Sequence, residues 1–238
     1  MKLHVEERIA GYIETVQSRV SDVVRNLADS SEIHECVRGS GRGLCYTRNS
    51  RFGRKHVNLG PGDYLVSEDD IVVSTVLGSC ISACLYSDTS PCFGMNHFLL
   101  PESCRNDACE DDIMRTSSAF YGINAMELVI NAMLHAGVKK HQLRAKVFGG
   151  GNVLKLASPR RTVGEQNVEF VLRFLEIERI PVTACSVGGD CARKIIYVQH
   201  SRDVLLQRLG HSADSVIATE EEKLYHRGIR KPDVSFFG

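Results

Sequence analysis

Two short stretches contain residues that together could form a thiol active site. Residues 74–87 read STVLGSCISACLYS and residues 93–101 read FGMNHFLLP, so Cys80 and His97 lie close together in the sequence. A cysteine attacks only as its thiolate, and a nearby imidazole lowers the pKa of the thiol and accepts its proton. Cys80 and His97 are therefore candidates for a nucleophile and its general base. The competing interpretation is that both side chains fill a core, because free cysteine is among the most buried residue types.

The residues before Cys80 predict a strand that ends in a sharp turn. Residues 70–77 are largely β-branched and apolar, and Gly78 follows them. A glycine lets the backbone turn and leaves amide groups free, so the amides of Gly78, Ser79 and Cys80 are candidates for an oxyanion hole. If the strand stays extended as far as Cys80, Ser74 lies on the same face as the cysteine. Ser74 is then a candidate to orient the imidazole, as the third member of a catalytic triad does.

Other cysteines and a glycine run raise two further possibilities, a metal site and a phosphate loop. Zinc prefers cysteine and histidine ligands, and five such residues are available: Cys84, Cys92, His97, Cys104 and Cys109. The sequence contains no Cys-x-x-Cys pair, and Cys84 falls in a predicted strand, so we predict no metal site. Residues 149–151 are three glycines that lack the lysine of a phosphate loop. They indicate instead that the backbone crosses close beneath another element.

Charge and hydropathy limit the classes of partner. Lys+Arg and Asp+Glu are equal at 29 each, so the overall charge favours neither nucleic acid nor a membrane surface. No apolar run is long enough to span a bilayer, and residues 1–12 are too charged for a signal peptide. We therefore expect a cytoplasmic protein without membrane insertion. In that reducing compartment, the nine cysteines are expected to be free thiols, not a disulfide framework.

The hydrophobic pattern divides the chain into four parts. A heptad-like apolar stripe predicts an amphipathic helix over residues 1–35, and a Gly- and Arg-rich linker or loop follows over residues 36–62. Residues 63–211 mix strand and helix patterns and are expected to form one domain. Residues 212–238 have little pattern and are expected to be a surface tail. The order of elements predicts an α/β or α+β layered sandwich, a mixed β-sheet covered by helices, with an N-terminal helical extension.

Local signals mark both helices predicted within the domain. Apolar positions recur on one helical face of residues 116–137, and Gly137 occupies a good C-terminal position for that helix. Thr162 and Glu165 have the spacing of a capping box in front of a second amphipathic helix. We therefore expect one helix between the strands around His97 and the glycine run, and another after the glycine run.

Several segments in this order resemble the CheD family of chemotaxis proteins, the chemoreceptor glutamine deamidases. The resemblance covers about residues 57–209. It rests on five motifs, GPGDYLVSEDDIVVSTVLGSC, GMNHFLLP, KVFGGGNVL, VGEQNV and GGDCARKIIY. It implies a single α/β sandwich with a Cys–His–hydroxyl site and no cofactor. It also implies hydrolysis of glutamine side chains to glutamate on methyl-accepting chemotaxis receptors.

The resemblance assigns roles by motif. Cys80 is the implied nucleophile and His97 the implied general base and acid. The family has a threonine six residues before the cysteine, where this chain has Ser74, with Thr75 as the neighbouring alternative. We assign the substrate pocket to residues of the same motifs, Asn96, Gly149 and Gly150.

The implied partners are the cytoplasmic helices of chemoreceptors and, in some family members, a CheC-like phosphatase. An alternative is a non-catalytic chemotaxis adaptor that keeps the fold and binds such a phosphatase or a receptor. Another Cys–His acyl-transfer enzyme, such as a transglutaminase or a protease, is a third possibility. A complete set of Cys80, His97 and a neighbouring hydroxyl favours an enzyme over an adaptor.

Overall fold

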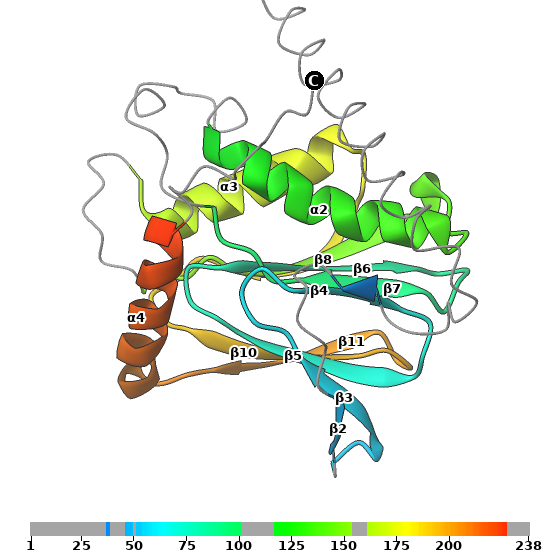
Figure 1. The fold of residues 1–238 in the computed structure, drawn as a ribbon, viewed down its shortest axis with the longest axis horizontal. Helices are drawn as coiled ribbons and strands as arrows, with labels where there is room; N and C mark the ends of the chain where they lie inside the picture. Colours follow the sequence, from blue (N-terminus) through cyan, green and yellow to red (C-terminus); the bar gives the residue numbers. More distant parts are fainter. Residues whose placement is uncertain (1–36, 39–45, 50, 101–116, 154–160, 228–238) are drawn as a thin grey trace, which may run out of the picture.

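The structure is a computed structural model, and it describes residues 37–38, 46–49, 51–100, 117–153 and 161–227. The helix predicted over residues 1–35 lies outside the described residues. Two β-sheets stack face to face, and two helices cover the outer face of one of them (Figure 1). The predicted α/β layered sandwich is therefore confirmed, although the strands form two sheets where the sequence pattern predicted one.

The first sheet is the middle layer of the sandwich. Its strand order is β1 (Val37–Arg38), β4 (Tyr64–Ser67), β7 (Phe93–Asn96), β6 (Ile81–Ser87), β8 (Leu143–Gly149) and β9 (Val182–Val187). The pairs are antiparallel except for β8 and β9, which run parallel. All seven residues of β6 are buried, because this central strand is covered by helices on one face and by the second sheet on the other.

The second sheet forms the outer layer on the side away from these helices (Figure 1). Its strand order is β11 (Asp203–Arg208), β10 (Arg193–Val198), β5 (Ile71–Leu77), β3 (Arg54–Asn58) and β2 (Tyr46–Asn49). Strands β3 and β5 are parallel and the other pairs are antiparallel, so both sheets are mixed. Strand β5 in this sheet leads directly into β6 in the first sheet, so the chain between them crosses from one layer to the other.

Three α-helices lie within the described residues, together with the short 3₁₀ helix η3 (Lys140–Gln142). Helices α2 (Ser117–His135) and α3 (Val163–Ile177) pack on the first sheet, and α4 (His211–Arg227) stands at one end of the sandwich (Figure 1). None of these helices is long and apolar enough to span a membrane.

Strand alternation separates two apolar cores. In β6, Ile81, Ala83 and Leu85 pack toward α2 and α3, whereas Cys84 and Tyr86 pack toward the second sheet. The core between the sheets is dominated by aromatic and branched side chains, and the rings of Phe93 and Tyr197 stack there with centroids 4.9 Å apart.

The local helix signals are confirmed. Gly137 follows α2 with a φ of +88°, the left-handed conformation that glycine adopts readily at the end of a helix. At the start of α3, the Thr162 side chain accepts a hydrogen bond from Glu165 N, and the Glu165 side chain accepts one from Thr162 N. These two reciprocal bonds form the expected capping box.

Two segment predictions are corrected. The predicted linker, residues 36–62, contains β1, β2 and β3, which pair with strands of both sheets. The predicted tail, residues 212–238, instead begins within α4, which extends to Arg227. Both segments are polar, and α4 has no apolar stripe, so hydrophobic periodicity carries no signal for either.

Candidate active site

Cys80 lies in the turn that joins the two sheets. Strand β5 ends at Leu77, residues 78–80 turn, and β6 begins at Ile81. The strand is therefore not extended as far as Cys80, which was the premise for placing Ser74 on the face of the cysteine. The Cys80 side chain is completely buried and faces the core between the sheets.

The glycine run lies directly beneath this turn. Gly150 N donates a hydrogen bond to Cys80 O at 2.7 Å, and Gly151 N donates one to Gly78 O at 2.6 Å. A Cβ atom at Gly149 would overlap the Cys80 carbonyl oxygen. The predicted close crossing of the backbone is confirmed. Gly149 and Gly150 lie against the turn of residues 78–80, and their assignment to a substrate pocket stays a prediction.

Gly149→Ala is expected to lower the free energy of unfolding by about 4 kcal/mol or more, because the new methyl group displaces the Cys80 carbonyl. Gly137→Ala is the matched control, since that glycine also has a positive φ but has no atom within 4 Å of the added carbon. The control should lose about 1–2 kcal/mol, the cost of left-handed backbone alone. Urea denaturation measures both values, and equal losses would contradict the close approach.

Asn96 is a buried residue whose amide is hydrogen-bonded on both sides. Its side-chain oxygen accepts a hydrogen bond from Ala83 N at 2.9 Å, and its side-chain nitrogen donates to Ala125 O at 3.1 Å. Only 2% of Asn96 is exposed. The amide thus joins β6 and β7 to α2, and the assignment of Asn96 to a substrate pocket stays a prediction.

A second buried amide, that of Asn167 on α3, holds the turn of residues 78–80 in place. Its nitrogen donates to Ser79 O at 2.8 Å, and its oxygen accepts from Leu100 N at 2.9 Å. Sequence reasoning missed this residue. The available signal was a polar residue on the apolar face of α3, between Val163 and Val171, where a buried amide requires hydrogen-bond partners.

His97 follows β7 and lies on the same side of the first sheet as Cys80. An antiparallel bridge pairs Ile81 with Phe98, through hydrogen bonds of 2.9 Å in both directions. Cys80 and His97 each precede a bridged residue, so the turn that carries Cys80 lies next to the segment that carries His97. The imidazole does not hydrogen-bond the Cys80 thiol in this structure, because Nε2 has no partner among the described residues.

A threonine hydroxyl orients the imidazole. Thr75 Oγ1 donates a hydrogen bond to Leu59 O at 2.7 Å and lies 2.7 Å from His97 Nδ1. Because its single proton is directed to Leu59, the hydroxyl accepts from His97 Nδ1–H. The other ring nitrogen, Nε2, is then the unprotonated one, and it is buried without a hydrogen-bond partner among the described residues. This tautomer is the one that a general base requires.

Ser74 lies on the other face of β5. Its hydroxyl donates to Asn58 Oδ1 at 3.0 Å and lies 2.7 Å from His56 Nε2. Successive side chains of a strand point to opposite faces, so Ser74 and Thr75 cannot both reach the space between the sheets. Of the two hydroxyls predicted from the sequence, the structure brings Thr75 to His97 and directs Ser74 away from it.

The amides of the turn converge on a carboxylate from α4. Gly78 N and Cys80 N donate to Glu221 Oε1 at 2.9 and 3.2 Å, and Ser79 N donates to Glu221 Oε2 at 2.7 Å. The Ser79 hydroxyl also donates to Oε2, at 2.5 Å. Consecutive N–H groups that point at one place form an anion site of the oxyanion-hole type. Glu221 was missed by the sequence analysis, because it lies in the segment predicted to be a tail.

The electrostatics of this conformation keep both groups neutral. Burial raises the pKa of the Cys80 thiol well above its ordinary value, and the charge and hydrogen bond of Glu221 raise it further. Burial also lowers the pKa of His97 to about 4, against the opposing influence of Glu221, the Leu59 carbonyl and Asp63. The expected lowering of the thiol pKa by His97 is therefore not present in this structure, and burial is the largest reason.

The chain is similar to known proteins. A family model described as CheD chemotactic sensory transduction matches residues 99–208. The chain is 40% identical over 190 residues to a protein of Shewanella oneidensis named probable chemoreceptor glutamine deamidase CheD 1, covering 79% of this chain and 90% of that protein. This chain belongs to the CheD family.

Further CheD relatives show similar coverage. A protein of Albidiferax ferrireducens with the same printed name is 39% identical over 187 residues, which is 79% of this chain and 76% of that protein. A probable chemoreceptor glutamine deamidase CheD of Xanthomonas campestris is 40% identical over 185 residues, which is 78% of this chain and 89% of that protein. The stretch matched by the CheD family model ends before α4, so Glu221 lies outside it.

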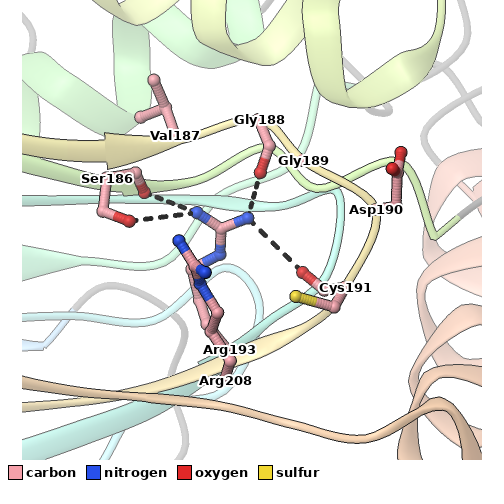
Figure 2. A pocket seen from close by; sticks show the side chains of 8 residues that line it. All are labelled: Ser186, Val187, Gly188, Gly189, Asp190, Cys191, Arg193 and Arg208. Atoms are coloured by element: carbon pink, nitrogen blue, oxygen red, sulfur yellow. Dashed lines mark hydrogen bonds between the residues drawn. The ribbon is translucent and has the colours of Figure 1, made fainter.

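A cavity of about 220 Å³ lies near the site in this CheD-family chain, but it is separate from the thiol. It is lined by Ser186, Val187, Gly188, Gly189, Asp190, Cys191, Arg193 and Arg208. The two terminal nitrogens of the Arg193 guanidinium donate to the carbonyls of Ser186, Gly188 and Cys191, as Figure 2 shows. The Arg193 Nε is buried without a hydrogen-bond partner among the described residues. Gly151 lies between this cavity and the turn of residues 78–80. A Cβ atom at Gly151 would press on the carbonyl oxygens of Cys191 and Gly78.

Proposed function

We propose that this chain is a protein-glutamine deamidase, which hydrolyses glutamine side chains of chemoreceptors to glutamate with Cys80 as nucleophile. The supporting observation is the imidazole of His97, held by Thr75 with its Nε2 lone pair open, on a segment bridged to the turn of Cys80, whose amides form an anion site. The printed names of the relatives, chemoreceptor glutamine deamidase, supply the substrate class. A CheC-like phosphatase as a second partner stays a prediction.

The first half-reaction forms a thioester. His97 Nε2 takes the proton of Cys80, and the thiolate attacks the carboxamide carbon of the substrate glutamine. The carbonyl oxygen becomes an oxyanion that accepts hydrogen bonds from the amides of Gly78, Ser79 and Cys80. Collapse of the tetrahedral intermediate breaks the carbon–nitrogen bond, and His97 gives its proton to the departing ammonia.

The second half-reaction uses water. His97 Nε2 removes a proton from a water molecule, whose oxygen attacks the thioester carbon within the same amide-lined site. The carbon–sulfur bond breaks, glutamate is released, and Cys80 recovers its proton from His97. The net change is consumption of one water and release of one ammonia for each glutamine, so the cycle needs no cofactor. Throughout both steps Thr75 accepts from Nδ1–H and keeps the ring in its orientation.

The decisive experiment incubates the full chain with the cytoplasmic fragment of a chemoreceptor and follows its peptides by mass spectrometry. We expect selected glutamines to become glutamate, with equimolar release of ammonia. Spontaneous deamidation is measured in parallel without enzyme. A receptor fragment that binds the chain but keeps every glutamine would overturn the deamidase and support the adaptor alternative.

A further inference from the structure

Helix α4 is docked through an acidic side chain. Within residues 213–226, whose side chains the structure describes, Glu221 is the buried one, with 3% of its surface exposed. The apolar contacts of α4 are only partly buried. They come from Ala218, Leu224 and Tyr225, which share a face with Glu221 and pack against the core between the sheets. Because Glu221 is buried more deeply than any apolar residue of α4 in this range, the groups that hydrogen-bond its carboxylate hold the helix in place.

The group that receives Glu221 is the proposed oxyanion hole. A buried carboxylate is normally paired with a cation, yet no lysine or arginine of the described residues forms an ion pair with Glu221. Its oxygens are satisfied by three consecutive backbone amides and the Ser79 hydroxyl. The same amides cannot hold a substrate oxyanion at the same time.

Glu221 also lies beside Cys80 and disfavours its thiolate. Its carboxylate accepts a hydrogen bond from Cys80 N at 3.2 Å, and the Cys80 side chain has no exposed surface. A negative charge at this distance opposes formation of a second negative charge on sulfur. The carboxylate therefore occupies the anion site beside Cys80 and helps to raise the pKa of the thiol.

We propose that α4 is an internal product mimic that closes the active site, and that substrate must displace it. This inference rests on the proposed function, because the group in the anion site, a glutamate side chain presented by a helix, is the chemical product of glutamine deamidation. The small apolar contact of α4 allows exchange, since elements that open for function come from the least stable part of a fold. The first turn of α4 is tied to the start of β10 by the hydrogen bond from Ala192 N to Asp214 Oδ1, 2.9 Å, so the helix can swing without leaving.

Alkylation of Cys80 by iodoacetamide, followed by peptide mass spectrometry, measures the closure without any substrate. Two variants open the site by different routes: Glu221→Ala removes the carboxylate, and Leu224→Ser weakens the apolar contact outside the anion site. Both should raise the alkylation rate of Cys80 at least about 10-fold, because a thiol reacts only when accessible and as thiolate. The matched controls on exposed positions of the same helix, Glu222→Ala and Val216→Ser, should react like the wild type.

The outcomes separate the closure from the proposed chemistry. Thermal melting followed by circular dichroism identifies folded variants, and Leu224→Ser decides the question if Glu221→Ala does not fold. Wild-type alkylation rates in the folded variants would overturn the closure by α4. Faster alkylation and faster receptor deamidation in both variants would support it. Faster alkylation with no glutamine conversion by any variant would overturn the proposed function and leave the closure supported.

Glu221→Gln tests the position of the carboxylate directly. This variant presents a carboxamide to Cys80, so the chain should slowly convert position 221 back to glutamate, with release of ammonia, and should not do so when Cys80→Ala is added. Mass spectrometry of the α4 peptide follows the conversion. An unchanged carboxamide at position 221, in a sample that deamidates receptor glutamine, would overturn the product-mimic assignment without affecting the proposed function.

Discussion

Cys80→Ala is expected to lower the rate of receptor glutamine conversion by about 10³-fold or more, because removing the nucleophile of a covalent mechanism leaves only binding and electrostatic effects. Cys84→Ala is the matched control, since this second thiol is also buried and packs in the same core between the sheets. Burial raises the pKa of Cys84 to about 12, and its position inside β6 places it away from the turn amides. The control should therefore keep nearly full activity.

Ammonia release and mass spectrometry of receptor peptides measure both cysteine variants, with urea denaturation to establish that each is folded. Conversion by Cys80→Ala at the wild-type rate would show that another group is the nucleophile. Loss of activity in folded Cys84→Ala, with Cys80→Ala unaffected, would move that role to Cys84.

Thr75→Val is expected to lower kcat by about 100-fold, with a smaller effect on KM. Valine keeps the branched shape of threonine but offers no acceptor to His97 Nδ1–H, so the tautomer with an open Nε2 is no longer favoured. Ser74→Ala should change kcat by less than about 2-fold, because its hydroxyl contacts His56 and Asn58 on the opposite face of β5 and does not touch the imidazole.

Thr75→Ser separates positioning from packing, because it keeps the hydroxyl and removes the methyl group. It should recover most of the activity lost in Thr75→Val. Steady-state kinetics of the three variants on one receptor fragment give the comparison. A loss of kcat in Ser74→Ala together with full activity in Thr75→Val would reverse the assignment of the orienting hydroxyl.

The sequence alone determined the features that depend on short stretches of backbone. The turn glycine before Cys80, the capping box at Thr162, the helix end at Gly137 and the close approach at Gly149 are local requirements of geometry. Each restricts the residue types at a few neighbouring positions, so residue type and spacing are enough to predict it. Cys80 and His97 could be proposed as a reactive pair in the same way, because the motifs around them are short and thiol and imidazole chemistry follows from residue type.

Only the tertiary structure decided which hydroxyl meets His97. Ser74 and Thr75 point to opposite faces of β5. Which of them lies on the side of Cys80 depends on where β5 ends, because a difference of one residue exchanges the two faces. The end at Leu77 follows from the crossing of the chain between the two sheets, which periodicity within β5 does not encode. The same holds for Asn96, whose amide is buried because α2 packs over it.

Glu221 is the clearest case of a contact decided by the fold. It is separated from Cys80 by 141 positions in the sequence, and it lies on a helix without an apolar stripe. Its burial comes from hydrogen bonds to backbone amides, which have no side-chain signature in the sequence. Sequence patterns record hydrophobic burial well and backbone recognition poorly. Cys80 could therefore be proposed as a nucleophile from the sequence, whereas the carboxylate bound to the amides of its turn could not be predicted.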